Sequence, residues 1–253
     1  MKLIASDYDG TLSFQSQIPP ENREAVARWR AAGNQFVIVT GRPYIFASDI
    51  LLNTHAPCDA LIACNGGMFL NGQAQITHKI TTDPRVLPPL VRLIYNHSPI
   101  LVVYSEGGSR IEYSEENGEL LIHPEENNFQ IPDFLTVPRS FAQICVCVST
   151  PEGAHKLARA VNEAFPGKLN AKPNDCNCDI TCYGVQKPLG IRRYVESLSQ
   201  KPEEILTVGD NFNDISMLEA YTGHAIAGSH TDVIRAAHGR TVASIADMVD
   251  RYL

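Results

Sequence analysis

Short, uninterrupted runs of apolar residues alternate with helical patterns at both ends of this 253-residue chain. The runs are too brief for helices, and most of them end in polar or glycine residues, so we predict that they are buried strands. They are Leu3–Ser6, Phe36–Val39, Ala60–Ala63, Ile205–Val208 and Ala225–Ala227. Short buried strands separated by helices are typical of a parallel sheet that is covered on both faces. The pattern therefore predicts an α/β fold with a doubly wound, Rossmann-like parallel sheet.

Three amphipathic helices fit this scheme. The first opens at Pro20 and stops at Gly33, because proline favours the first turn of a helix and glycine the position after its end. Its predicted apolar stripe consists of Ala25, Val26, Trp29 and Ala32. The second helix follows Lys187, and the third closes the chain from Ile245 to Tyr252.

The pattern changes between about Ile80 and Gly184. Candidate strands outnumber convincing helices there; the strands are 100–104, 110–113, 144–148 and 179–182, and the helices are 89–95 and 154–165. The acidic stretch Glu115–Arg139 contains several prolines, and we interpret it as a long loop or a hairpin. We therefore expect an α+β domain with an antiparallel sheet, over residues 81–183, inserted into a core formed by residues 1–80 and 184–253.

The composition argues against several classes of protein. Lys and Arg number 21 against 28 Asp and Glu, and the resulting net charge of −7 argues against a nucleic-acid or anionic-membrane partner. No window approaches the roughly 18 uninterrupted apolar residues of a membrane helix. Asp7 comes too early for a signal peptide, and seven cysteines are an odd number for a disulfide framework. We therefore expect a cytoplasmic protein with free thiols.

Several cysteines lie on two predicted strands of the inserted domain: Cys145, Cys147, Cys176, Cys178 and Cys182. A soft-metal site is one interpretation. However, the spacing is not the paired C-x₂-C of a zinc ribbon, and cysteine is a common small core residue. We therefore predict buried structural thiols.

Two carboxylates follow the first strand, in Asp7-Tyr8-Asp9-Gly10-Thr11. A glycine turn brings both to one site, where their repulsion favours a divalent cation or leaves one ionised and the other protonated. An ionised aspartate can be a nucleophile, and its partner can be a general acid and then a base. The alternative is a structural turn in which the Asp and the Thr cap the next helix.

Polar residues also follow the second and fourth strands. Thr40-Gly41-Arg42 offers a hydroxyl, backbone N–H groups and a guanidinium to phosphate oxygens, although Thr-Gly is also ordinary turn chemistry. Asp210 and Asp214 offer hard oxygen ligands that suit Mg²⁺, and they also suit the N-cap of the following helix. Ligands of parallel sheets bind beyond the carboxyl ends of the strands, so one edge of the sheet carries the chemistry.

The order of these motifs resembles a known family. Asp-Tyr-Asp-Gly-Thr (7–11), Val-Thr-Gly-Arg (39–42), Lys187 and Gly-Asp-Asn-Phe-Asn-Asp (209–214) resemble the four motifs of the haloacid dehalogenase superfamily of phosphohydrolases. Asn65-Gly66-Gly67 and Asp210–Leu218 are similar to the Cof-type sugar-phosphate phosphatases in particular. The long interval between the second motif and Lys187 implies that the α/β cap of this subfamily is inserted after the third core strand.

The resemblance implies roles that the residues alone do not. Asp7 would attack phosphorus and become an aspartyl phosphate, and Asp9 would protonate the leaving alkoxide and then activate water. The side chains of Asp7 and Asp210 and the backbone carbonyl of Asp9 would bind Mg²⁺. Asp214 would support these metal ligands from outside the coordination sphere.

A further group would bind the phosphoryl oxygens: Thr40, Lys187, Asn213 and the N–H groups of Tyr8 and Gly41. Arg42 is a candidate contact to the substrate. Two positions depart from the family pattern: Pro188 stands where glycine is frequent, and His230 stands in a segment that is commonly Gly-Asn-Ala. Neither position touches the four motifs, and we interpret His230 as a surface residue.

These observations predict a Mg²⁺-dependent phosphatase of small phosphorylated metabolites such as sugar phosphates, present as a monomer or a weak homodimer. Two alternatives remain: a mutase that returns the phosphoryl group to a sugar, and a catalytically idle sugar-phosphate sensor. The set of Asp7, Asp9, Lys187 and Asp210 argues against the sensor, because binding alone needs neither a nucleophile nor an acid.

Overall fold

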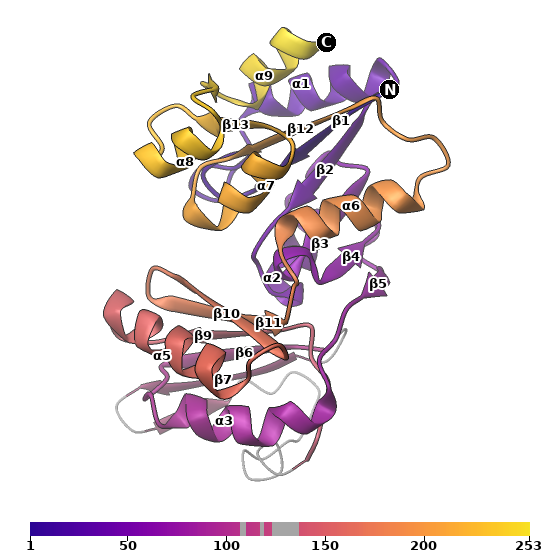
Figure 1. Ribbon diagram of the computed structural model, residues 1–253. Coiled ribbons are helices and arrows are strands. Elements are labelled where there is room, and N and C mark those ends of the chain that lie inside the picture. Colours follow the sequence, from indigo (N-terminus) through magenta and orange to yellow (C-terminus); the bar gives the residue numbers. More distant parts are fainter. Residues whose placement is uncertain (107–109, 117–118, 123–136) are drawn as a thin grey trace. The chain divides into compact units, whose positions relative to one another are not determined.

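The computed structural model describes residues 1–106, 110–116, 119–122 and 137–253, and the chain divides into two compact units (Figure 1). The first unit comprises Met1–Arg42, Phe46–His78 and Gln186–Leu253, and the second comprises Pro43–Ile45 and Lys79–Val185. Most of the second unit is thus one insertion into the first. No helix among the described residues is long and apolar enough to span a membrane.

The first unit is built on an eight-stranded sheet with the strand order β14-β13-β12-β1-β2-β3-β4-β5. Neighbours from β14 to β3 pair in parallel, and β4 turns back antiparallel to β3. In chain order the strands are β1 (Lys2–Ser6), β2 (Gln35–Val39), β3 (Ala60–Ala63), β4 (Met68–Leu70), β5 (Ile76–Lys79), β12 (Glu204–Gly209), β13 (Thr222–Ile226) and β14 (Thr241–Val242). The parallel part of this sheet confirms the predicted doubly wound core.

Helices cover both faces of this sheet. One pair, α1 (Pro20–Ala31) and α9 (Ile245–Tyr252), packs together, and a second pair, α6 (Lys187–Ser197) and α7 (Ile215–Ala220), packs over the other face (Figure 1). Apolar strand residues such as Leu3, Val37 and Ile62 form the core beneath the second pair. The remaining elements are α2 (Tyr44–Leu52), α8 (Thr231–Ala236) and the short 3₁₀ turns η1 (Cys64–Gly66) and η3 (Phe212–Asp214).

Helix α1 shows where the apolar pattern holds and where it fails. Pro20 occupies the first turn, where its missing N–H costs nothing, and Val26 and Trp29 are fully buried. The predicted stripe is wrong at Ala32, which is exposed and lies at the C-cap. The helix has already ended there, because Gly33 adopts a left-handed φ of 83°.

The second unit contains six described strands in the order β10-β11-β9-β6-β7-β8, and the pairs are antiparallel. They are β6 (Leu101–Ser105), β7 (Arg110–Glu116), β8 (Glu119–Ile122), β9 (Gln143–Cys147), β10 (Leu169–Asn174) and β11 (Asn177–Cys182). The helices α3 (Leu87–Tyr95) and α5 (Pro151–Ala164), with the 3₁₀ turn η2 (Pro84–Val86) before α3, pack on one face and bury Ile144 and Ile180. The predicted α+β insertion is confirmed. Within the stretch 115–139, β7 and β8 pair antiparallel, and residues 117–118 and 123–136 lie outside the described part of the chain.

All seven cysteines are free thiols, as predicted, but their burial differs from the prediction. Cys178 lies in the core of the second unit, whereas Cys145 and Cys147 are only half-buried. They alternate along β9 with Ile144 and Val146, which face the helices, so the two thiols point to the other face of the sheet. Among the described residues, no group of cysteines is placed to hold a metal ion.

Strand β13 begins earlier than the predicted run 225–227, because Gly223 and His224 pair with β12 although neither is apolar. His224 is buried, and both of its ring nitrogens have partners. Nδ1 lies 3.1 Å from the carbonyl oxygen of Thr222, and Nε2 lies 2.8 Å from the hydroxyl of Tyr252. A neutral imidazole that donates from Nδ1 and accepts at Nε2 satisfies both contacts and ties β13 to α9.

We predict that His224 makes the stability of the protein depend on pH. Burial lowers the pKa of His224 below its ordinary value of 6.5, so the unfolded chain takes up a proton that the folded chain resists. The stability contributed by the neutral ring is therefore complete above pH 6.5 and is lost as the pH falls from 6.5 toward the lower folded-state pKa.

Urea denaturation checks this expectation. His224→Gln should lower the free energy of unfolding by about 1 kcal/mol at pH 7.5, where a buried hydrogen bond is lost, and by less at pH 5. His155→Gln, at an exposed position of α5, is the control and should behave like the wild type at both pH values. A His224→Gln effect of the same size at both pH values would contradict the prediction.

Candidate active site

Three neighbouring strands end in residues of the predicted site. Asp7 follows β1, Thr40 follows β2 and Asp210 follows β12, and these strands are adjacent in the sheet. Because the strands are parallel, their carboxyl ends lie at the same edge. The Asp7 N–H donates to the carbonyl of Val208 at 2.9 Å, so the pairing of β1 with β12 continues up to the first motif. We refer to this edge as the catalytic edge.

A cluster of three carboxylates lies at the catalytic edge. Asp7, Asp210 and Asp214 each offer one oxygen, and these oxygens lie within 4.8 Å of one another. The Thr11 hydroxyl donates to Oδ1 of Asp210 at 2.8 Å, a contact between distant motifs that the sequence does not predict. Oδ2 of the fully buried Asp214 accepts from the N–H groups of Asp210 and Asn211 at 3.1 Å each. Asp214 thus completes the capping box of η3, whereas the predicted side-chain cap of the following helix α7 is wrong, because Asp214 stands at that N-cap without a side-chain bond.

Lys187 lies between two of these carboxylates. Its Nζ is 2.5 Å from Oδ1 of Asp7 and 2.5 Å from Oδ1 of Asp214. The side chain is fully buried, although most lysines are solvated. The lysine is the first residue of α6, and the turn tolerates Pro188 because proline is accepted in the first turn of a helix.

Burial and charge determine the electrostatics of this cluster. Burial raises the pKa of Asp7 to about 8, although the ammonium of Lys187 opposes this, and burial also raises the pKa of Asp210. Burial opposes the charge of Lys187 as well, but Asp214 and Asp7 outweigh it and raise the pKa of Lys187. Three carboxylates therefore face one ammonium. This donor set fits a hard divalent cation such as Mg²⁺, whose charge would keep Asp7 ionised in spite of its raised pKa.

Asp9 has different surroundings from Asp7. Its side chain is 56% exposed and forms a two-pronged ion pair with Arg42, in which Nε donates to Oδ2 at 2.8 Å and Nη2 to Oδ1 at 2.6 Å. The guanidinium carbon of Arg42 also lies 5.0 Å from the centre of the Tyr8 ring, within the range of a cation–π contact. The first motif thus supplies one buried and one exposed carboxylate. The partner of Arg42 was not predictable from the sequence.

The turns after β2 and β3 pack against each other. Thr40 is buried, its carbonyl accepts from the N–H of Asn65 at 3.1 Å, and its Oγ1 accepts from the N–H of Arg42 at 3.1 Å. A Cβ on Gly41 would lie 3.1 Å from Oδ1 of Asn65 and 3.4 Å from Nδ2 of Asn213. Gly41 and Asn213, from distant motifs, are therefore close neighbours at the catalytic edge.

Two glycines allow α6 to bring Lys187 to this edge. Gly66 has a φ of 105°, and a Cβ there would lie 2.4 Å from the carbonyl oxygen of Gln186. A Cβ on Gly190 would lie 2.8 Å from the Cα of Gly66. The backbones of η1 and α6 thus touch, and only glycine permits this approach.

His230 belongs to the start of α8 and is exposed. Its Nδ1 accepts from the N–H of Asp232 at 3.2 Å, and its ring packs against Phe212 with 4.9 Å between the ring centres. The bond to Asp232 caps α8, and the ring contact joins His230 to a residue of the fourth motif, which the sequence did not predict.

The chain is similar to known proteins over nearly its whole length. The family of haloacid dehalogenase-like hydrolases matches residues 4–249. Pyridoxal phosphate phosphatase YbhA of Escherichia coli (strain K12) is 27% identical over 260 residues, covering 93% of this chain and 90% of that protein. A haloacid dehalogenase-like hydrolase from Bacillus subtilis has a similar structure, with a TM-score of 0.81, 20% identity and 100% of both chains covered. A sugar phosphatase of haloacid dehalogenase subclass IIB gives a TM-score of 0.72 at 23% identity, covering 99% of this chain and 97% of that one.

The chain therefore belongs to the family of haloacid dehalogenase-like hydrolases, which confirms the resemblance seen in its ordered motifs. Within this family it is a phosphatase, and thus an enzyme.

We predict that Gly10→Ala removes most of the phosphatase activity by displacing Asp210. Gly10 has a φ of 76°, and a Cβ there would lie 2.4 Å from Oδ2 of Asp210, so the carboxylate must move. Displacements of about 1 Å in a catalytic group cost about a hundredfold in rate, and we expect a fall of this order in kcat with p-nitrophenyl phosphate.

Gly33→Ala is the matched control. Gly33 has a φ of 83°, and nothing lies within 4 Å of its Cβ position. This variant should lose about 1–2 kcal/mol of stability through backbone strain alone and keep its kcat. Equal losses of kcat in the two variants would show that strain, and not Asp210, is responsible.

Proposed function

We propose that this protein is a Mg²⁺-dependent phosphatase that hydrolyses phosphomonoesters of small metabolites through an aspartyl phosphate on Asp7. The observation that carries the proposal is the buried contact of Lys187 with both Asp7 and Asp214, beside Asp210. Burying charged groups costs folding free energy, and ionisable groups with shifted pKa values cluster at catalytic sites, where the reaction requires them.

In this proposal Asp7 is the nucleophile. Its Oδ1 accepts the bond from Lys187, which leaves Oδ2 to attack phosphorus. The new O–P bond forms as the bond from phosphorus to the leaving alkoxide breaks. Water then hydrolyses the aspartyl phosphate, releasing inorganic phosphate and restoring the carboxylate.

Asp9 is the general acid and then the general base. In its protonated form it gives its proton to the leaving alkoxide, and the resulting carboxylate takes a proton from the water that attacks the aspartyl phosphate. Its exposed side chain is open to the substrate and to water, and the two bonds from Arg42 orient it. Arg42 is also proposed to contact the substrate.

The phosphoryl oxygens are held by donors from several strand ends: the N–H groups of Tyr8 and Gly41, the hydroxyl of Thr40, the ammonium of Lys187 and the amide of Asn213. Donors that are fixed in place before the reaction stabilise the charge of the transferring group without reorganisation. The close approach of Gly41 to Asn213 supports their joint assignment.

Mg²⁺ would be held by the side chains of Asp7 and Asp210 and the backbone carbonyl of Asp9. When bound, it would neutralise phosphoryl charge as a Lewis acid. Asp214 binds both the N–H of Asp210 and the ammonium of Lys187, so it would hold a metal ligand and a phosphate donor in position.

For the substrate we propose a small phosphorylated metabolite such as a sugar phosphate, selected by a cap over residues 81–183. The names of the relatives, a pyridoxal phosphate phosphatase and a sugar phosphatase, support this size class. The net charge of −7 argues against a nucleic-acid or anionic-membrane partner. The free thiols support our proposal of a cytoplasmic location, and we propose a monomer or weak homodimer. A screen of phosphorylated metabolites with Mg²⁺ tests the substrate class; released phosphate indicates hydrolysis, and an isomerised phosphosugar indicates a mutase.

Metal removal is the first test. Because Asp7 and Asp210 would share one hard cation, excess chelator should abolish the hydrolysis of p-nitrophenyl phosphate, and Mg²⁺ should restore it. Ca²⁺ should restore it poorly, because it prefers more ligands and a looser geometry. Full activity in excess chelator would reject the metal assignment.

Lys187→Met is the second test. Removal of one hydrogen-bond donor to the charge of the transition state lowers kcat by a factor of about 10²–10³. Lys187 also neutralises its two partner carboxylates, so we expect kcat to fall by at least this factor. Lys156→Met removes an exposed lysine of α5 and should leave kcat unchanged. Circular dichroism checks that both variants fold. A folded Lys187→Met variant within a few-fold of the wild type would contradict the proposed role.

A further inference from the structure

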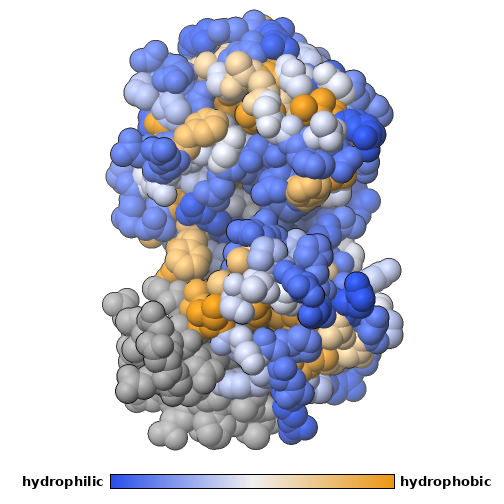
Figure 2. Space-filling view, turned by 90° about the vertical axis from the view of Figure 1, so that its left-hand side faces the viewer, coloured by the Kyte–Doolittle hydropathy of each residue, from blue (hydrophilic) through white to orange (hydrophobic). Residues whose placement is uncertain are grey.

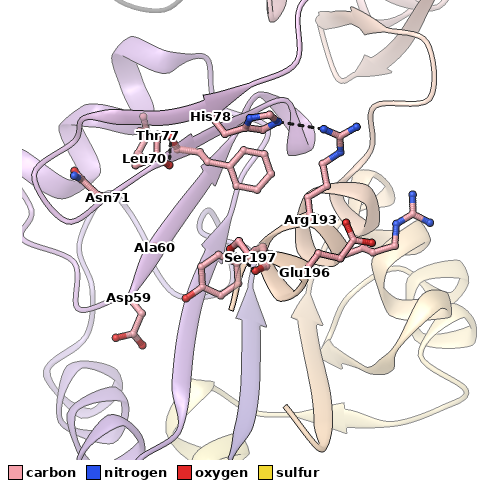
Figure 3. Close-up of a pocket in the computed structure, with 12 residues that line it drawn as sticks. Asp59, Ala60, Leu70, Asn71, Thr77, His78, Arg193, Glu196 and Ser197 are labelled. Carbon is pink, nitrogen blue, oxygen red and sulfur yellow. Dashed lines mark hydrogen bonds between the residues drawn. The ribbon is translucent and has the colours of Figure 1, made fainter. Parts of the chain in front are cut away.

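A second candidate binding site lies on the first unit, away from the catalytic edge. It is a pocket of about 700 Å³, lined by the start of β3, by β4 and β5, and by the second half of α6 (Figure 3). Asp59 and Ala60 line it at the amino end of β3, whereas the catalytic residues follow the carboxyl ends of strands parallel to β3. The pocket therefore lies at the opposite edge of the sheet and takes no part in the proposed reaction.

Aromatic and apolar side chains form part of the pocket wall. Phe69 from β4 is 6% exposed, and its ring packs against that of His78 with 5.4 Å between the ring centres. Tyr194 from α6 also lines the pocket, and its hydroxyl donates to Oε1 of Gln35 at 2.5 Å. Both rings are thus held in place by neighbours. Fixed aromatic walls favour a flat aromatic ligand, because ring faces and edges pack closely without loss of side-chain freedom.

Positive charge gathers at one end of the pocket. Nη1 of Arg193 lies 3.1 Å from Nε2 of His78, and Figure 3 shows this contact at the far end from Asp59. A guanidinium keeps its protons, so Nε2 of His78 accepts and the ring offers its Nδ1–H as a donor. Within the described part of the chain, neither Arg192 nor Arg193 forms an ion pair with a carboxylate.

The acidic side chains of the pocket do not cancel this charge. Asp59 is already neutralised, because Arg30 donates to its Oδ1 at 2.7 Å and the N–H of Phe36 donates to its Oδ2 at 2.9 Å. Glu196 also lines the pocket and makes no ion pair among the described residues, but its single charge is outnumbered by those of Arg192 and Arg193, which line the pocket too. The pocket therefore favours an anion.

We propose that this pocket binds a small aromatic anion, that is, a flat ring carrying a carboxylate or a phosphate. The ring would pack against Phe69 and Tyr194, and the anionic group would accept from Arg193, with His78 beside it. A volume of about 700 Å³ lies within the range of roughly 300–1,000 Å³ that is typical of small-molecule sites. A charge-assisted bond to a guanidinium supplies the selectivity for an anion.

Calorimetric titration of the full chain tests this proposal with 2-naphthoate, which a phosphatase cannot hydrolyse, and with its neutral analogue 2-naphthamide. We expect saturable binding of 2-naphthoate and at least about tenfold weaker binding of 2-naphthamide. Arg193→Gln should weaken the binding of 2-naphthoate at least about tenfold, as the loss of a charge-assisted hydrogen bond does. Arg159→Gln, at an exposed position of α5 in the other unit, removes the same charge and should not change it.

The hydrolysis of p-nitrophenyl phosphate should be unchanged in Arg193→Gln, because the pocket is remote from the catalytic edge. The proposal is overturned if 2-naphthoate shows no saturable binding at millimolar concentration, if Arg193→Gln binds it as tightly as the wild type, or if Arg159→Gln weakens it equally. These readouts do not depend on catalysis, so they are independent of the proposed phosphatase mechanism.

Discussion

The arrangement of the catalytic edge depends on the buried ion pairs of the Lys187 ammonium with two carboxylates. This ammonium contacts Asp7, which follows the first strand, and Asp214, which lies near the other end of the chain. Without it, two buried carboxylates would lose their counter-charge, and breaking a buried ion pair in this way typically costs about 3–5 kcal/mol. The surrounding backbone is arranged to keep the lysine there, since η1 and α6 approach so closely that both contact positions, Gly66 and Gly190, must be glycine.

The two carboxylates of the first motif lie in different electrostatic surroundings, which supports the different roles that we propose for them. Asp7 is buried beside an ammonium and two other carboxylates, a setting that suits a shielded nucleophile next to a cation. Asp9 is exposed and oriented by Arg42, a setting that suits proton exchange with a leaving group and with water. Environments that differ in this way allow two identical side chains, two residues apart, to perform different chemistry.

Much of the first unit was predictable, because parallel strands that are buried on both faces consist of continuous apolar runs. Such runs coincide with β1, β2, β3 and β12. The motifs at their ends indicated the family and the candidate residues. The hydrogen-bond partners of side chains from distant motifs were not predictable, because a local sequence pattern indicates which residues are buried but not which side chains contact one another. Thr11 with Asp210, and Arg42 with Asp9, are pairs of this kind. The buried His224 escaped the apolar pattern because hydrogen bonds, and not hydrophobicity, place it inside.

A rapid-quench experiment on Asp9→Asn tests most directly whether Asp7 carries the phosphoryl group while Asp9 transfers the protons. p-Nitrophenyl phosphate releases a stable phenolate that needs no acid, so with Mg²⁺ present the variant should release a burst of nitrophenol approaching one per active site. It should then stall with phosphate bound to Asp7, because an amide cannot activate water. Steady turnover at the wild-type rate, or a stalled enzyme whose phosphate is not on Asp7, would contradict the account.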